Sequence, residues 1–356
     1  MKKIIAILLL VAMTIPTLTS CTKGTEKRTL NVYNWGENIS DGTDDSLDVI
    51  AEFEAKNPDI KVNYTNYATN EEMYAKIKSS GASYDVIIPS DYMIGKMISE
   101  DMLEELDFNN IPNYKDSMPE VESQMQSFDP DKKYAVPYTW GTVGIIYNKT
   151  MVSDPVDSWD ILWNEKYKGK ILMFDNSRDA FGIAQKKLGF SQNTENSDEI
   201  NLCGEELKKQ RPLVQAYVMD QIFDKMGAGE AALAPYYAGD AVMMMDENPD
   251  LDFVIPKEGS NKFVDAMVIP KGAKNKTDAE KFINFMCDTE IAKANIEYIN
   301  YSTPLKAVFD TLPDEVKNNV IIYPNKKDVD RCENFLNLDK AIAKIMEDLW
   351  IKVKSN

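Results

Sequence analysis

Hydrophobic and polar residues along the chain follow two periods, and their succession predicts alternating strands and helices. Stretches that alternate or are rich in β-branched residues indicate strands, and apolar residues three or four positions apart indicate helices. In the first half, strands are expected at 30–34, 60–64 and 84–88, and helices at 44–57, at 70–81 and from Ser90. Because each strand is followed by a helix, we expect an α/β lobe built on a mostly parallel sheet.

The second half of the chain repeats this alternation without repeating the sequence. Strands are expected at 169–174, 231–236, 251–256 and 263–269, and helices at 179–188, from Asp240, from Thr277 and at 338–353. The stretch from Thr277 to Glu280 has the pattern of a capping box, which predicts that a helix begins there. At the usual domain size, a chain of 356 residues is expected to form two domains.

The N-terminus has the pattern of an export signal. Two lysines precede an apolar run at 4–13, which is too short for a spanning helix of about 20 residues. The Leu-Thr-Ser-Cys sequence at 18–21 then resembles the end of a bacterial lipoprotein signal. We therefore expect a signal peptide at 1–20, a lipid on Cys21 and a tether at 21–28. The protein would lie outside the cytoplasm, in the periplasmic space, anchored to the cell membrane by lipid alone. An ordinary secretory signal with a chance cysteine is the alternative.

Composition excludes several kinds of chemistry. The chain contains no histidine, which excludes Ser-His-Asp and Cys-His catalysis and the His-Glu-x-x-His zinc motif. The remaining cysteines are isolated in the sequence: Cys203, Cys287 and Cys332. We therefore expect buried thiols and no metal or cofactor, and a single disulfide between two of them is the open alternative. With 58 acidic against 40 basic residues, the formal net charge is −18. Such a chain repels nucleic acid and favours a cationic ligand.

Candidate ligand-binding residues follow the expected strands. In open α/β sheets, ligands bind beyond the carboxyl ends of the strands. The residues found near these ends are mainly aromatic and acidic: Trp35, Glu37, Ser90, Tyr92, Asp179, Tyr237, Phe263 and Asp265. Aromatic rings pack on methylene groups and attract cations, and carboxylates accept charged hydrogen bonds from ammonium groups. The set therefore predicts a site for an aliphatic ammonium compound, although each residue alone could equally be core or surface.

Ordered matches along nearly the whole chain give it a family resemblance. They include Tyr33-Asn34-Trp35, 70–76 (NEEMYAK), 84–90 (YDVIIPS), 136–141 (VPYTWG), 159–163 (WDILW), 254–259 (VIPKEG) and 301–304 (YSTP). On these residues the chain resembles the substrate-binding lipoproteins of spermidine/putrescine ABC transporters. The resemblance implies an α/β, two-lobed type II periplasmic-binding-protein fold with a ligand cleft between the lobes. By analogy, lobe 1 is 28–136 with 264–305, and lobe 2 is 137–263 with 306–356.

The resemblance also implies a function and roles for individual residues. The protein would bind spermidine or putrescine, close its lobes and deliver the ligand to the permease of an ABC importer, without catalysis. The implied roles are an aromatic wall for Trp35, amine and backbone contacts for Ser90 and Tyr92, ammonium binding for Asp179 and Asp265, an aromatic box for Tyr237 and Phe263, and a pocket tyrosine for Tyr301. Asn38, Asn176 and Phe335 depart from the family pattern, which leaves the exact polyamine open.

Two other functions stay open at this point. Tyr236 and Tyr237 resemble the tandem tyrosines of ferric-ion-binding receptors, since phenolate oxygens suit a hard ion. Glu37 and Asp265 could serve as the paired carboxylates of a secreted hydrolase such as a glycosidase. The colour of iron bound to phenolate would indicate the first function, and turnover of a glycan would indicate the second.

Overall fold

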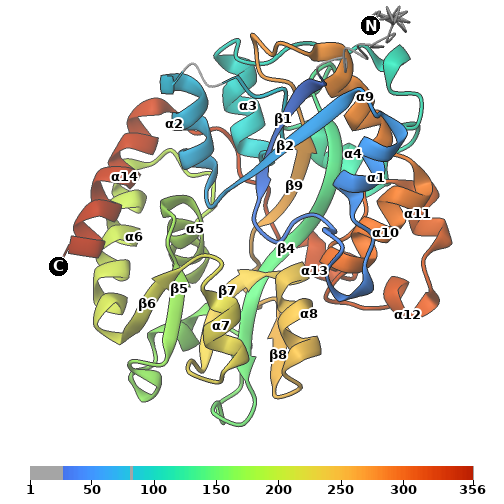
Figure 1. Ribbon diagram of the computed structural model, residues 1–356. Coiled ribbons are helices and arrows are strands. Elements are labelled where there is room, and N and C mark those ends of the chain that lie inside the picture. Colours follow the sequence, from blue (N-terminus) through green and yellow to red (C-terminus); the bar gives the residue numbers. More distant parts are fainter. Residues whose placement is uncertain (1–26, 81–82, 356) are drawn as a thin grey trace, which may run out of the picture.

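The first lobe is built on a parallel sheet of β2 (Ile60–Tyr67), β1 (Arg28–Trp35) and β3 (Val86–Ile87), in that order (Figure 1). The computed structural model describes residues 27–80 and 83–355, so the expected signal peptide, Cys21 and most of the tether lie outside the described residues. The first helices are α1 (Val49–Lys56), α2 (Asn70–Ser80) and α3 (Asp91–Ser99). The parallel sheet expected for this lobe is confirmed.

The second lobe contains a mixed sheet (Figure 1). Its strands are β5 (Ile171–Phe174), β6 (Val214–Val218), β7 (Leu233–Tyr237), β8 (Leu251–Val254) and the last part of β4 (Val136–Asn148). β9 (Lys262–Met267) pairs with the first part of β4 and packs with the first lobe. β5 runs parallel to β6 and β7, whereas β4 is antiparallel to β7, β8 and β9. The alternation of strands and helices therefore continues into this lobe, but its strands do not all run parallel as they do in the first lobe.

β4 is a long, buried strand that connects the two lobes. Its first part pairs with β9, where Val136 lies opposite Met267, and its last part pairs with β7 and β8. Every residue of β4 except Tyr147 is buried. A strand covered on both faces shows no alternation of apolar and polar residues, which is why the pattern did not predict it.

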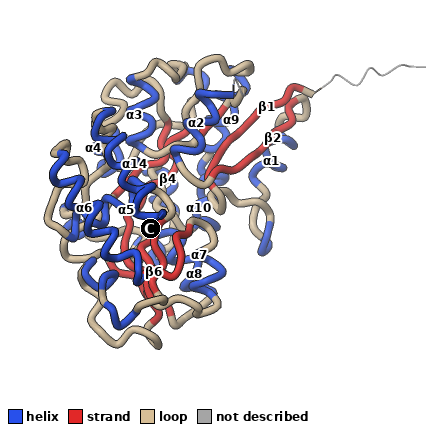
Figure 2. The backbone as a smooth tube through the Cα atoms, turned by 90° about the vertical axis from the view of Figure 1, so that its left-hand side faces the viewer, coloured by secondary structure: helices blue, strands red, loops and turns tan. Residues whose placement is uncertain are grey.

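Helices cover both lobes. The remaining ones are α4 (Pro119–Met125), α5 (Ser177–Lys187), α6 (Ser197–Gln210), α7 (Ile222–Gly227), α8 (Ala238–Glu247), α9 (Lys276–Met286), α10 (Thr289–Ile299), α11 (Lys306–Thr311), α12 (Asp314–Lys317), α13 (Lys326–Asp330) and α14 (Lys340–Ser355). α14 packs against α6 and α5, and Figure 2 shows these helices from the side. Among the helices of the described ranges, none has the length and apolar character needed to cross a bilayer.

Two predicted helix starts differ from the structure. α1 begins at Val49, because the Asp48 carboxylate accepts a hydrogen bond from the Ala51 backbone at 2.8 Å and so caps the helix there. α9 begins at Lys276, which places Thr277 inside the helix, where it cannot act as the cap. The capping-box prediction at Thr277 was therefore wrong, while the helix itself is present.

Buried hydrophobic side chains form clusters that follow the two lobes. The largest cluster lies in the second lobe and includes Trp159, and the other two lie in the first lobe, one of them around Phe282. Val308 packs in the cluster around Phe282, although the analogy with the family grouped 306–356 with lobe 2. Ile299 packs in the second-lobe cluster. By its packing, α11 therefore belongs with the first lobe.

Candidate functional site

A cleft lies between the two lobes. It is bordered by the carboxyl ends of β1 and β7, the starts of α3 and α5, and one face of β9. The predicted residues that line it are Trp35, Ser90, Tyr92, Asp179, Tyr237, Phe263, Asp265 and Tyr301. Segments far apart in the chain thus meet here, as the rule for strand ends in open α/β sheets predicts.

Trp35 and Tyr92 belong to the first-lobe wall of the cleft. β1 ends at Trp35, whose ring packs on Tyr67 with the ring centroids 4.6 Å apart. Ser90 precedes α3, so Tyr92 lies in the first turn of that helix. The Tyr92 hydroxyl donates a hydrogen bond to the Glu71 carboxylate at 2.8 Å. The end of β1 and the starts of α2 and α3 therefore place aromatic rings and a carboxylate on the same side of the cleft.

Asp265 is a buried acid on β9, with 6% of its surface exposed. Its carboxylate accepts hydrogen bonds from Ser90 Oγ at 2.6 Å and from Thr139 Oγ1 at 3.3 Å. Burial raises the pKa of Asp265 to about 7; the charges of Asp91 and Asp179 also raise it, while the two hydroxyls lower it. Both groups that bond to this carboxylate are neutral, so they orient its charge without balancing it.

Asp179 lies on the second-lobe side, in the first turn of α5. Asn176 caps this helix by accepting from the Asp179 backbone at 2.8 Å, and its amide donates to the Asp179 carboxylate at 2.6 Å. The Tyr237 hydroxyl donates to the same carboxylate at 2.9 Å. Burial raises the pKa of Asp179, and these hydrogen bonds oppose that shift. The cap and the tyrosine together fix the direction of the carboxylate.

Aromatic rings form a continuous surface between these acids. The ring of Phe263 meets Tyr237 at a centroid distance of 5.5 Å and Tyr301 at 6.2 Å, both edge-on. The Tyr301 hydroxyl donates to Asp240 at 2.8 Å. A Cβ at Gly239 would lie 2.4 Å from the Tyr301 ring, so this approach requires glycine. The arrangement suits a ligand that has apolar methylene groups between its polar ends.

The cleft is also lined by acids that the sequence analysis did not select: Glu71, Asp91, Asp220 and Asp240. Burial raises the pKa of Asp91 to about 7 and that of Asp240 to about 8. The charge of the buried Arg178 opposes the shift at Asp91. No lysine or arginine of the described chain lines the cleft itself. Asp220 follows β6, so the strand-end rule would have found it if that strand had been predicted.

Glu37 lies apart from the other predicted site residues. It is exposed, its backbone is left-handed with φ 46, and it does not border the cleft. As a ligand contact it stays a prediction. Because only Asp265 of the proposed catalytic pair lines the cleft, Glu37 and Asp265 do not face one shared space, as the paired carboxylates of a glycosidase must.

The tandem tyrosines at the end of β7 both border the cleft. Burial raises the pKa of both the Tyr236 and the Tyr237 hydroxyls, which disfavours the phenolates that a ferric ion would need. Within residues 27–80 and 83–355, no three or more cysteine, aspartate or glutamate side chains are grouped so that they could hold a metal ion. Cys203, Cys287 and Cys332 are buried free thiols. None of these observations favours the ferric-ion alternative.

Comparison with known proteins decides the family. Residues 48–324 match the bacterial extracellular solute-binding proteins. The chain belongs to this family. The solute-binding protein is 35% identical over 339 residues to the spermidine/putrescine-binding periplasmic protein of Escherichia coli (strain K12), and the match covers 94% of each chain. The family resemblance drawn from the sequence is confirmed.

Solved structures show the same fold. The solute-binding protein is similar to a Listeria monocytogenes structure named for spermidine/putrescine ABC transport, with a TM-score of 0.86 at 39% identity, covering 92% of this chain and 99% of that one. It is also similar to the spermidine/putrescine ABC transporter substrate-binding protein PotD of Streptococcus pneumoniae. That TM-score is 0.76 at 37% identity, again covering 92% and 99% of the two chains. The two-lobed α/β fold expected from the sequence is therefore confirmed.

Proposed function

We propose that this solute-binding protein binds a polyamine, spermidine or putrescine, and delivers it to an ABC importer. The observation that carries the proposal is the lining of the cleft. The buried carboxylates of Asp240 and Asp265 and the half-buried one of Asp179 lie beside aromatic rings, and the described lining contains no lysine or arginine. Ammonium groups would bind the carboxylates while methylene groups pack on the rings. The ligands named for the Escherichia coli and Streptococcus pneumoniae relatives support the same ligand class.

In this proposal the protein changes conformation and carries the polyamine, but it does not catalyse a reaction. The open form captures the polyamine, the lobes close about the segments that connect them, and the closed form docks on a membrane permease. β4 is one such connection, since it pairs with β9 at one end and with β7 and β8 at the other. The ligand favours closure because it contacts acids and rings of both lobes only in the closed form.

The ligand assignment is tested by titrating the protein with spermidine and with putrescine in a calorimeter, while tryptophan emission is followed in parallel. We expect saturable heat and a change in emission, because of the five tryptophans, all within the described residues, only Trp35 lines the cleft. In the control variant Trp35→Phe the emission change should disappear. Heat with neither polyamine, together with binding of another cation, would overturn the ligand but not the fold.

We also propose that Cys21 carries a lipid that holds the mature protein at the cell membrane. The pattern of Leu-Thr-Ser-Cys at 18–21 supports this, after a short apolar run. When cells are fractionated, the wild type and the neighbouring control variant Thr22→Ala should both stay with the membranes. Cys21→Ala should be lost from the membrane fraction. A Cys21→Ala protein that stayed membrane-bound would rule out the anchor at this residue.

A further inference from the structure

The side-chain oxygen of Asn261 is an acceptor in the cleft wall without a partner. Asn261 is buried, with 4% of its surface exposed, and it lines the cleft. Its Oδ1 atom accepts no hydrogen bond. A buried acceptor without a donor costs free energy, and such groups in native proteins are rare. An N–H group of a bound ligand would remove this cost.

Asn261 belongs to a row of three residues on one face of the chain. Asn261, Phe263 and Asp265 occupy alternate positions at β9, and all three line the cleft, whereas Lys262 and Val264 between them do not. Successive residues of a strand advance about 3.3 Å, so Asn261 and Asp265 lie about 13 Å apart along the chain. The wall therefore presents an acceptor, an aromatic ring and a carboxylate in order.

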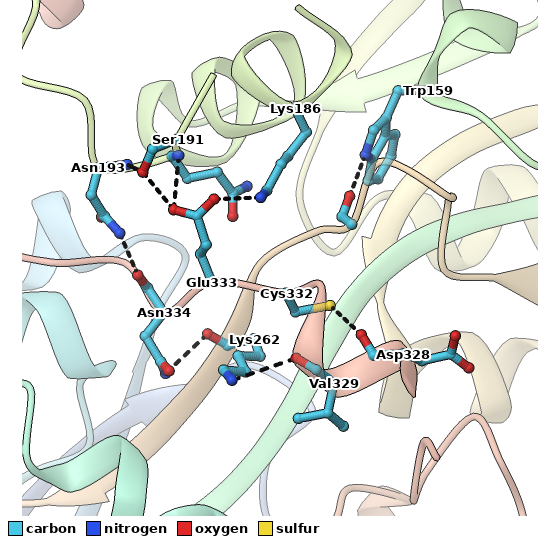
Figure 3. A network of polar contacts seen from close by, with 12 residues as sticks. Trp159, Lys186, Ser191, Asn193, Lys262, Asp328, Val329, Cys332, Glu333 and Asn334 are labelled. Carbon is cyan, nitrogen blue, oxygen red and sulfur yellow. Dashed lines mark hydrogen bonds and ion pairs between the residues drawn. The ribbon is translucent and has the colours of Figure 1, made fainter. Parts of the chain in front are cut away.

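The backbone around Asn261 is held from both sides. Val143 donates its backbone N–H to the Asn261 carbonyl at 2.9 Å, and Lys262 donates to the carbonyl of Glu333 at 3.0 Å. Glu333 is held in turn by Ser191, whose hydroxyl donates to its carboxylate at 2.6 Å (Figure 3). These contacts hold the backbone of Asn261 in place, and its side chain borders the cleft, where a bound ligand would supply the missing donor.

We propose that Asn261 accepts a hydrogen bond from the third nitrogen of a triamine such as spermidine, while Asp265 binds an ammonium group further along the same ligand. This inference rests on the proposed polyamine function. The separation along β9 exceeds the length of a four-carbon diamine and suits the longer triamine. An uncharged amide also adds an acceptor without adding another negative charge to a cleft that already contains several acids. Asn261 is thus a determinant of selectivity for triamines over diamines.

The test uses Asn261→Leu, which keeps the size of the side chain and removes the acceptor. Calorimetry on the full chain should show spermidine binding about ten-fold weaker and putrescine binding changed less than about two-fold. Thr142→Val is the matched control. Thr142 pairs with Lys262, its Oγ1 is also buried without a partner, and it does not line the cleft. Its loss should leave both affinities unchanged.

Three outcomes decide between the interpretations. Unchanged spermidine affinity in Asn261→Leu overturns the inference, and an equal loss for both ligands overturns the assignment to the third nitrogen. If the wild type binds neither polyamine, the proposed function itself fails. If Asn261→Leu does not fold, Asn261→Asp decides: its carboxylate should tighten spermidine binding about ten-fold while leaving putrescine binding unchanged. Unchanged spermidine binding there overturns the inference.

Discussion

An Asp265→Asn variant is expected to bind spermidine and putrescine about 2–5 kcal/mol more weakly than the wild type, the cost of truncating one side of a buried charged pair. Asparagine has the shape of aspartate but not its charge. Ser90 at 2.6 Å and Thr139 at 3.3 Å would still hold the side chain in place. The ammonium group would then lose its charged partner and keep its desolvation cost. Titration calorimetry measures this loss directly.

The same variant should gain stability in the absence of ligand, which separates lost binding from damaged folding. Burial raises the pKa of Asp265 to about 7, so the ionised carboxylate destabilises the empty fold above that pH. At about pH 8, Asp265→Asn should therefore have a higher melting temperature than the wild type. The exposed acid Asp224 offers a control with the same change of charge, and Asp224→Asn should alter neither quantity. Wild-type affinity in Asp265→Asn would contradict the assignment.

Polyamine affinity is expected to fall steeply as the pH is lowered from 8 towards 5. Burial raises the pKa of Asp240 to about 8 and those of Asp91 and Asp265 to about 7, all above the ordinary value for aspartate. An ammonium ligand needs the ionised carboxylates, so below these pKa values it must displace protons. Each such carboxyl then lowers the affinity about ten-fold per pH unit. Calorimetric titrations across this range measure the slope.

Proton release distinguishes this mechanism from a general loss of structure. At about pH 6.5, titrations in two buffers of different ionisation enthalpy should show protons released on binding, and fewer in Asp240→Asn. The empty protein should behave in the opposite direction. Between the unfolded and folded pKa values, the fold holds more protons than the unfolded chain, so its melting temperature should fall as the pH rises through this window. Affinity that stays flat with pH would contradict the role of these acids.

Local pattern predicted much of the fold. β1 and α2 appear where the residue pattern predicted a strand and a helix. β4 escaped prediction because it is buried on both faces and shows no period. Thr277 was predicted to cap a helix, but Asn275 occupies the cap position of α9. The position of a cap depends on backbone angles, which the sequence alone does not specify.

The residues of the candidate site were likewise predicted only in part. The strand-end rule found Trp35 and Asp179, because any α/β sheet brings the ends of its parallel strands together. It also selected Glu37, which is exposed, and passed over Asp240, which is buried in the cleft. Both outcomes depend on how the chain turns after its strand, where Glu37 has a left-handed backbone and Asp240 lies in the first turn of α8.

The sequence by itself determined the α/β class and the aromatic and acidic character of the strand ends, because these depend on periodicity and local order, and its resemblance to known transporter lipoproteins implied the family and the two-lobed fold. Only the tertiary structure decided which acids share one cleft and which polar atoms are left without a partner there. Ser90 and Asp265 lie 175 positions apart yet form a hydrogen bond, and Asn261 is orphaned because no neighbour in the fold reaches its oxygen. Burial, pKa and hydrogen-bond satisfaction are set by such distant neighbours, and a local pattern does not contain them.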